Sequence, residues 1–230
     1  MVPKDVIPKG SIIYKLLIVI LGVGLAYTLF YPQSLWQGEK AHTKQCRDNM
    51  EHILYAESVY LMQNNAYTPN LRKAVDIIKN DPTGKMLKTY MRSDSVLAYN
   101  IIKMFKKDNY AAVIIDSLQR FARRNNVDTL QALIFDSLRT DQKYGRKYAP
   151  KIDSMAWYSL NHLYTCPTTN DTYHIEIVDT SVIKVMNVAC PVSTQDSLRV
   201  ENDFKLRRLG GLTIKNHGRI KDWERSWANR

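Results

Sequence analysis

Residues 16 to 30 read LLIVILGVGLAYTLF and contain no charged side chain. Because an α-helix rises about 1.5 Å per residue, a helix over residues 12–31 is about 30 Å long, which is the thickness of the hydrocarbon core of a bilayer. The Leu, Ile, Val and Phe side chains of this stretch favour insertion by about 3 to 6 kcal/mol in total. We therefore predict a transmembrane helix over residues 12–31 and a membrane as one partner of the chain.

The charges around this stretch indicate its orientation. The basic residues on its N-terminal side are Lys4, Lys9 and Lys15. Short, positively charged tails usually stay in the cytoplasm, although Lys40 and Lys44 on the other side make the charge difference modest. We predict a single-pass protein of the inner (cytoplasmic) membrane, with a cytoplasmic tail at 1–11 and the C-terminal domain in the periplasm.

A cleaved signal peptide is the alternative to a retained anchor. Gly24 and Ala26 are small residues at the spacing that a signal peptidase requires. The apolar stretch continues beyond that point, from Tyr27 to Tyr31, and this favours a retained anchor over cleavage.

Two features near the membrane predict contacts with other proteins. Gly22 and Ala26 form a small-xxx-small pair, which allows a second membrane helix to approach closely. Pro32 is expected to end the transmembrane helix, so residues 32–38 are predicted to form a connector. Trp36 lies within this connector, and an indole suits the headgroup region. We predict membrane-helix contacts at Gly22 and Ala26 and a partner contact at Trp36.

The composition indicates a folded, basic domain after the anchor. The 230 residues include few Gly and Pro, and 45% of them are hydrophobic, so a core of ordinary size is expected. The formal net charge of +11 favours anionic lipid, cell-wall material or other acidic surfaces as partners. Nucleic acid is not expected, because basic clusters such as Arg207 and Arg208 match no recognised nucleic-acid-binding motif.

Apolar residues recur at helical spacing through the middle of the chain. A helix is predicted over about residues 39–63, with an apolar stripe that includes Cys46 and Met50 and is interrupted at Glu57. Thr68 and Pro69 are a suitable N-cap and first residue for a helix that ends at Lys79. Residues 85–164 continue in a mostly helical pattern.

The last third of the chain changes to strand patterns. Residues 173–178 and 182–188 are rich in β-branched side chains and are separated by a polar turn, which predicts a β-hairpin. Leu212–Ile214, between two turns, is predicted to form a further short strand. The predicted fold class is α+β: an N-terminal transmembrane helix, then an exported domain over 39–230 that is mainly helical, with a small antiparallel sheet near the C-terminus.

One part of this pattern resembles a known family. The residues MEHILYAESVY at 50–60 follow the membrane stretch, and Asn64 to Thr68 precede another helix. Over about residues 12–80 this arrangement resembles the type IV pilins and pseudopilins. The resemblance implies a long N-terminal helix packed on an antiparallel sheet, and subunits that assemble through their membrane segments. The chain lacks the glutamate that this family has early in the apolar stretch, and Ser11 follows Gly10 where the family has a prepilin peptidase site.

The three cysteines predict a disulfide. Cys166 and Cys190 bracket the predicted hairpin, whose strands bring the two ends together, while Cys46 lies on the preceding long helix. Closing this loop of roughly 25 residues is expected to stabilise the fold by about 3.5 kcal/mol. We predict a Cys166–Cys190 disulfide; a bridge from Cys46 to either residue and three free thiols are the alternatives. No metal site is predicted, since the chain has no Cys-x-x-Cys pair and its histidines are dispersed.

No catalytic residue or cofactor is predicted. The chain lacks the usual phosphate-binding, dinucleotide-binding and nucleophile-elbow motifs. Trp223 and Trp227 lie four residues apart in a basic C-terminus and are predicted to contact a partner. We therefore predict a non-catalytic interaction or assembly subunit of an envelope complex; a pseudopilin-like subunit of a secretion or fibre system and an envelope enzyme are the alternatives.

Overall fold

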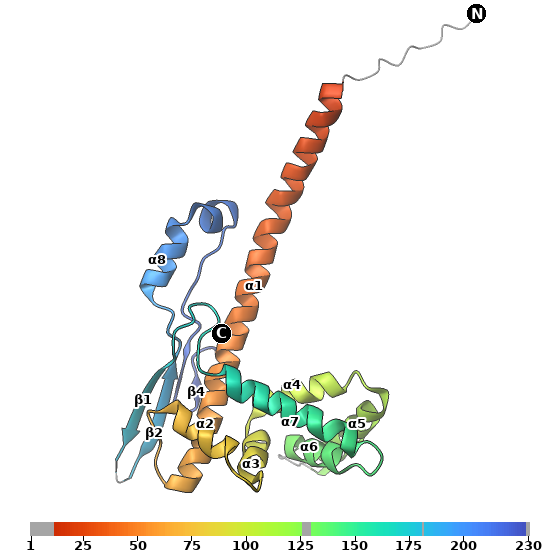
Figure 1. Cartoon of the computed structure of the whole chain (residues 1–230), viewed down its shortest axis with the longest axis vertical. Helices are drawn as coiled ribbons and strands as arrows, with labels where there is room; N and C mark the ends of the chain where they lie inside the picture. The colour runs from red at the N-terminus through yellow and green to blue at the C-terminus, as the bar shows by residue number, and fades with distance from the viewer. Residues whose placement is uncertain (1–11, 126–129, 181, 229–230) are drawn as a thin grey trace, which may run out of the picture. The chain divides into compact units, whose positions relative to one another are not determined.

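A computed structural model describes residues 12–125, 130–180 and 182–228. The predicted cytoplasmic tail at 1–11 lies outside these residues. The helices are α1 (Ile12–Asn64), α2 (Leu71–Lys79), α3 (Lys85–Ser93), α4 (Ser95–Phe105), α5 (Asn109–Asn125), α6 (Leu130–Thr140), α7 (Gly145–His162), α8 (Thr194–Asn202) and the short π-helix η1 (Phe204–Leu209). The strands are β1 (His174–Asp179), β2 (Lys184–Ala189), β3 (Arg219–Lys221) and β4 (Glu224–Arg225). Figure 1 shows the predicted combination of one long N-terminal helix, shorter helices and a small antiparallel sheet.

The chain divides into two compact units. The smaller unit contains Met1–Ala41 and Ser193–Lys215, and the larger unit contains His42–Val192 and Asn216–Arg230. The exported domain was predicted as one continuous segment from residue 39, so the separate grouping of residues 193–215 was not anticipated.

Helix α1 carries the apolar stretch at the N-terminal end. Among the described residues, α1 is the helix that is long and apolar enough to cross a membrane, and its most apolar part is exposed. The predicted connector at 32–38 is not a break, because α1 continues through Pro32. Proline removes one backbone hydrogen bond, but the neighbouring turns remain helical, and Ser34 Oγ donates to the carbonyl of Tyr31.

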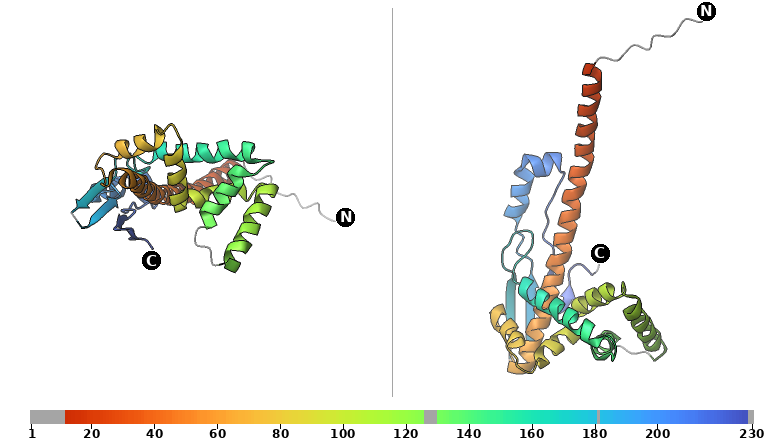
Figure 2. Two further views of the ribbon diagram at one scale, coloured as in Figure 1. Left: turned by 90° about the horizontal axis from the view of Figure 1, so that it is seen from below. Right: turned by 45° about the vertical axis from the view of Figure 1, so that its right-hand side comes forward.

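The second half of α1 supplies the central apolar stripe of the larger unit. Its fully buried side chains are Cys46, Met50, Ile53, Ala56 and Glu57, together with the nearly buried Leu54 and Val59. These positions confirm the predicted stripe and its interruption by one acid. In the same unit, α4, α5, α6 and α7 pack in sequence on one another, and Figure 2 shows these helices next to one another.

Helix α2 begins two residues later than predicted. Asn70 is its N-cap, and the Asn70 side chain accepts a hydrogen bond from the backbone N–H of Arg72. Thr68 is buried, and its backbone N–H donates to Glu57 Oε2 at 3.1 Å. The Thr68 segment is therefore held against α1 instead of starting the helix.

The sheet has the strand order β1-β2-β3-β4, and every neighbouring pair is antiparallel. The predicted hairpin is confirmed, with Ile177 opposite Met186. The predicted strand at Leu212–Ile214 is wrong: the third strand is β3, which places Ile220 opposite Val188. The carbonyl of Ile214 instead accepts a hydrogen bond from Ser197 of α8. A pattern of three residues is too short to distinguish a strand from an irregular segment.

Within the smaller unit, α8 and η1 lie beside α1. Helix α8 begins with a capping box, in which Ser193 accepts from the Asp196 N–H and the Asp196 carboxylate accepts from the Ser193 N–H. At the end of η1 the chain approaches α1 so closely that a Cβ on Gly210 would lie 2.4 Å from Leu35 Cδ1. Figures 1 and 2 both show α8 alongside α1.

Candidate metal centre

Three cysteines and one histidine meet inside the larger unit. The ligand atoms of Cys46, Cys166, Cys190 and His217 all lie within 4.8 Å of one another, and all four residues are buried. Cys46 Sγ lies 3.5 Å from Cys190 Sγ and 3.6 Å from Cys166 Sγ. Cys166 Sγ lies 3.9 Å from His217 Nδ1. The fold therefore gathers four metal-binding side chains from four distant parts of the sequence.

Each ligand is positioned by a different element. Cys46 lies on α1, Cys166 follows α7, Cys190 follows β2, and His217 precedes β3. A tight turn holds Cys166, since its N–H donates to the Asp171 carbonyl and its carbonyl accepts from the Asn170 N–H. This turn brings the end of α7 back toward the sheet.

The segment around His217 is fixed by backbone contacts. Asn216 Nδ2 donates to the carbonyls of Cys190 at 3.1 Å and Val192 at 2.8 Å, and the Cys190 N–H donates to the Gly218 carbonyl. Gly218 has a φ of +118°, and a Cβ there would lie 2.6 Å from the Ser226 hydroxyl, so only glycine fits this position without a shift. These bonds hold His217 and Cys190 next to each other.

Polar neighbours surround the four ligands. Arg47 Nε donates to the His217 carbonyl at 2.9 Å, and the Tyr173 hydroxyl donates to the Cys46 carbonyl at 3.4 Å. Hydrogen bonds from the Cys190 and Cys46 thiols lower the pKa of Cys166, while the hydrogen bonds with Cys166 and Cys190 raise the pKa of Cys46. The protein thus favours a thiolate at Cys166 and places the positive charge of Arg47 beside the cluster.

The spacing of the ligand atoms suits a tetrahedral metal ion. Two sulfur ligands about 2.3 Å from Zn²⁺ lie about 3.8 Å apart, close to the separations in this cluster. A disulfide would require about 2.0 Å. Three cysteines and one histidine complete a coordination shell of four, which leaves no open position for water or substrate. The arrangement therefore suits a structural metal ion.

The predicted Cys166–Cys190 disulfide is not formed in this structure, where all three cysteines are free. The prediction that the hairpin brings Cys166 and Cys190 together is consistent with the geometry. Sequence reasoning missed Cys46 and His217 as members of the same cluster. A search for closely spaced ligand pairs could not find this site, because its closest ligands in sequence, Cys166 and Cys190, lie on either side of a β-hairpin.

The other predicted contact residues have different surroundings. Gly22 and Ala26 lie on the exposed part of α1, and a Cβ on Gly22 would meet no atom within 4 Å. Trp36 is half exposed and lies beside Gly211. Trp223 packs edge-on against Tyr55, and Trp227 lies under the Arg47 guanidinium at 5.3 Å. Partner binding by these residues stays a prediction.

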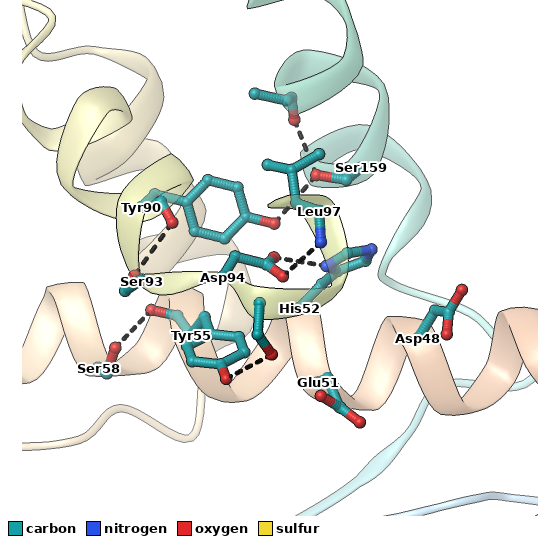
Figure 3. Close-up of polar contacts among 12 residues, drawn as sticks. Asp48, Glu51, His52, Tyr55, Ser58, Tyr90, Ser93, Asp94, Leu97 and Ser159 are labelled. Atoms are coloured by element: carbon teal, nitrogen blue, oxygen red, sulfur yellow. Dashed lines mark hydrogen bonds and ion pairs between the residues drawn. The ribbon is translucent and has the colours of Figure 1, made fainter. Parts of the chain in front are cut away.

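A second polar cluster links α1 to the junction of α3 and α4, as Figure 3 shows. His52 Nδ1 lies 2.5 Å from Asp94 Oδ2, and both side chains are buried. Asp94 Oδ1 accepts the backbone N–H of Leu97 and so caps α4. Burial favours the neutral form of His52. The negative charge of Asp94, together with smaller contributions from other acids, outweighs the effect of burial, so the pKa of His52 is raised. This pair joins helices through a charged hydrogen bond.

Glu51, one turn before Tyr55, binds the last strand. Arg225 Nε and Nη2 donate to the two Glu51 carboxylate oxygens at 2.7 and 2.8 Å. Arg225→Met is expected to lower the free energy of unfolding by about 2 kcal/mol, because it leaves the nearly buried Glu51 carboxylate without its cation. Urea unfolding of the full-length protein in detergent measures this change. Arg219→Met, on the adjacent strand and exposed, is the matched control, and an equal loss in both variants would contradict a specific role for the pair.

Comparisons with protein-family models, with curated proteins and with solved structures each found no match for this chain. The resemblance to type IV pilins therefore stays a prediction, and function has to be argued from the site.

Proposed function

We propose that this chain is a single-pass membrane protein whose larger unit is a non-catalytic interaction domain held together by a structural zinc ion. The observation that carries this proposal is the closed set of three buried cysteines and one buried histidine. A catalytic zinc needs a position for water or substrate, whereas four protein ligands fill a tetrahedral shell. The site is therefore suited to stabilising the folded structure of the larger unit.

Zinc is the metal that fits these ligands best. Thiolate and imidazole ligands in a tetrahedral arrangement favour Zn²⁺ over Mg²⁺ or Ca²⁺, which take oxygen ligands. Three thiolates and a neutral imidazole around Zn²⁺ carry a net charge of −1, and the nearby cation Arg47, which donates to the His217 carbonyl, would offset part of it. Bound zinc would connect α1, the turn after α7, the end of β2 and the start of β3.

The long apolar part of α1 supports the membrane assignment. A helix in the bilayer keeps the domain at the membrane surface and so raises its effective concentration for neighbouring membrane proteins. The N-terminal lysines support a domain on the exported side of the inner membrane. The residues that we propose for contacts with other envelope proteins are Gly22, Ala26, Trp36, Trp223 and Trp227.

The test uses the full-length protein extracted from membranes with detergent. We expect the protein to stay in the membrane fraction after alkaline carbonate washing and to contain one zinc ion per chain by elemental mass spectrometry. Protease accessibility of the domain in spheroplasts reports its side of the membrane. Release by carbonate would contradict the membrane anchor, and a metal-free protein after purification without chelators would contradict the zinc centre.

A further inference from the structure

We propose that η1 is a docking surface for anionic lipid headgroups of the same bilayer that holds α1. This inference rests on the proposed membrane insertion of α1 but is independent of the metal centre. Within Phe204–Leu209, the residues Lys205, Arg207 and Arg208 are exposed cations, and no acidic residue lies among them. Exposed cations near a membrane surface are attracted by anionic lipids.

Apolar side chains accompany these cations. Phe204 is 61% exposed and Leu209 is 39% exposed, at the two ends of η1. An exposed phenylalanine next to Lys and Arg is typical of segments that lie in the headgroup region, where the ring enters the acyl boundary and the cations meet the phosphates. In water, the exposed Phe204 ring would contribute no favourable burial of apolar surface.

The chain places η1 at the depth where headgroups are expected. Gly210 and Gly211, which follow η1 directly, approach Leu35 and Trp36 of α1. Leu35 and Trp36 come four and five residues after Tyr31, the predicted end of the apolar span. At about 1.5 Å per residue they lie about 6 to 8 Å beyond the hydrocarbon core, which is the headgroup layer. Trp36 itself suits that layer.

Two of the acidic residues near η1, Asp203 and Asp196, cap helices, while Glu201, at the end of α8, is exposed. Asp203 Oδ1 accepts the backbone N–H groups of Lys205 and Leu206, and Asp196 completes the capping box of α8. The Asp203 and Asp196 carboxylates define the starts of η1 and α8. The cations of η1 therefore project from a segment whose backbone is held in place.

The test is amide hydrogen exchange of residues 204–209 in the full-length protein, reconstituted into nanodiscs. One set contains phosphatidylcholine alone, and the other contains phosphatidylcholine with 30% phosphatidylglycerol. Each cation near an anionic surface contributes about fivefold to the docking equilibrium, so three contribute about 100-fold. We expect slower exchange of η1 in the anionic nanodiscs, and loss of the difference in 0.5 M NaCl, because salt screens exposed charges.

The variant Lys205→Gln/Arg207→Gln/Arg208→Gln is expected to exchange at the same rate in both lipid compositions. The control Lys103→Gln/Lys106→Gln/Lys107→Gln removes the same charge from exposed positions in the larger unit and should keep the difference. Equally slow exchange in both lipids would mean that η1 is protected by packing on its own chain. Equally rapid exchange in both would mean that η1 does not bind the bilayer and that its cations are available for an acidic protein partner. Either result overturns the proposal. Failure of the protein to enter nanodiscs would instead contradict the membrane anchor.

Discussion

Replacing Cys46, Cys166 or Cys190 with Ser, or His217 with Gln, is expected to abolish zinc binding and to destabilise the larger unit by more than about 5 kcal/mol. Structural zinc sites bind with apparent free energies of about 10 to 16 kcal/mol, and this binding energy stabilises the folded state. That amount is comparable with the whole stability of an ordinary domain, about 5 to 15 kcal/mol. Zinc content and thermal unfolding of each full-length variant measure the two effects.

His174→Gln is the control for His217→Gln, because His174 is an exposed histidine on β1. This variant should keep its zinc and its unfolding temperature. Chelation of the unsubstituted protein should reproduce the ligand variants, since both remove the same metal. A Cys166–Cys190 disulfide in the native protein, found by non-reducing peptide mass spectrometry with Cys46 as a free thiol, would contradict the zinc centre and support the pairing expected from sequence.

The spacing of apolar residues was sufficient to predict structure that depends on a single helix or hairpin. The stripe through Cys46 and Met50 predicted the buried face of α1, and the β-branched residues on either side of residue 180 predicted the β1–β2 hairpin. Pro32 was misread because a local rule for proline ignores the helix that continues on both sides of it. The strand β3 was missed because Arg219 and Lys221 alternate with only one buried residue, Ile220.

The candidate site depended on tertiary structure that local patterns do not contain. Cys46 and His217 are separated by most of the chain, and their contact requires α1 to lie beside the sheet. The signal that could have suggested the site is indirect: Cys166 and Cys190 each lie just after a regular element, Cys46 lies on the buried face of α1, and Asn216-His217-Gly218 is a turn that the folded chain brings back to Cys190. Glu57 gave a clearer signal, because a lone acid on an apolar stripe needs a special environment.

Glu57 has that environment in the structure. It is fully buried, and Thr68 N–H donates to Oε2, while Oε1 has no hydrogen-bond partner among the described residues. Burial raises the pKa of Glu57 from 4.5 to about 7, and the Thr68 hydrogen bond opposes this only in part. The neighbouring Tyr67 does not add a charge beside Glu57 in this pH range, because burial and the Glu57 carboxylate raise the pKa of its phenol further above the ordinary value. Glu57 is therefore protonated in the folded protein at pH values where it ionises in the unfolded chain.

The sign of the pH dependence follows from these two pKa values. Below about pH 4.5 both states hold the proton; above that pH the unfolded chain loses it first, so the free energy of unfolding falls as the pH rises toward 7. A difference of this size corresponds to about 3 kcal/mol. The raised pKa of His52 also makes the free energy of unfolding fall as the pH rises, in this case above about pH 6.5.

Glu57→Gln is expected to stabilise the protein by about 2 to 3 kcal/mol at pH 8 and to change its stability little at pH 4.5, because the amide keeps an acceptor for Thr68 and cannot ionise. Urea unfolding of the full-length protein between pH 4.5 and 8, followed by tryptophan fluorescence, measures both values; Trp223, which packs on Tyr55, reports on this region. Glu224→Gln, an exposed acid on β4, should leave the pH profile unchanged. If Glu57→Gln left the slope between pH 5 and 7 intact, Glu57 would be ionised in the folded protein, and a cation or water inside the unit would have to balance its charge.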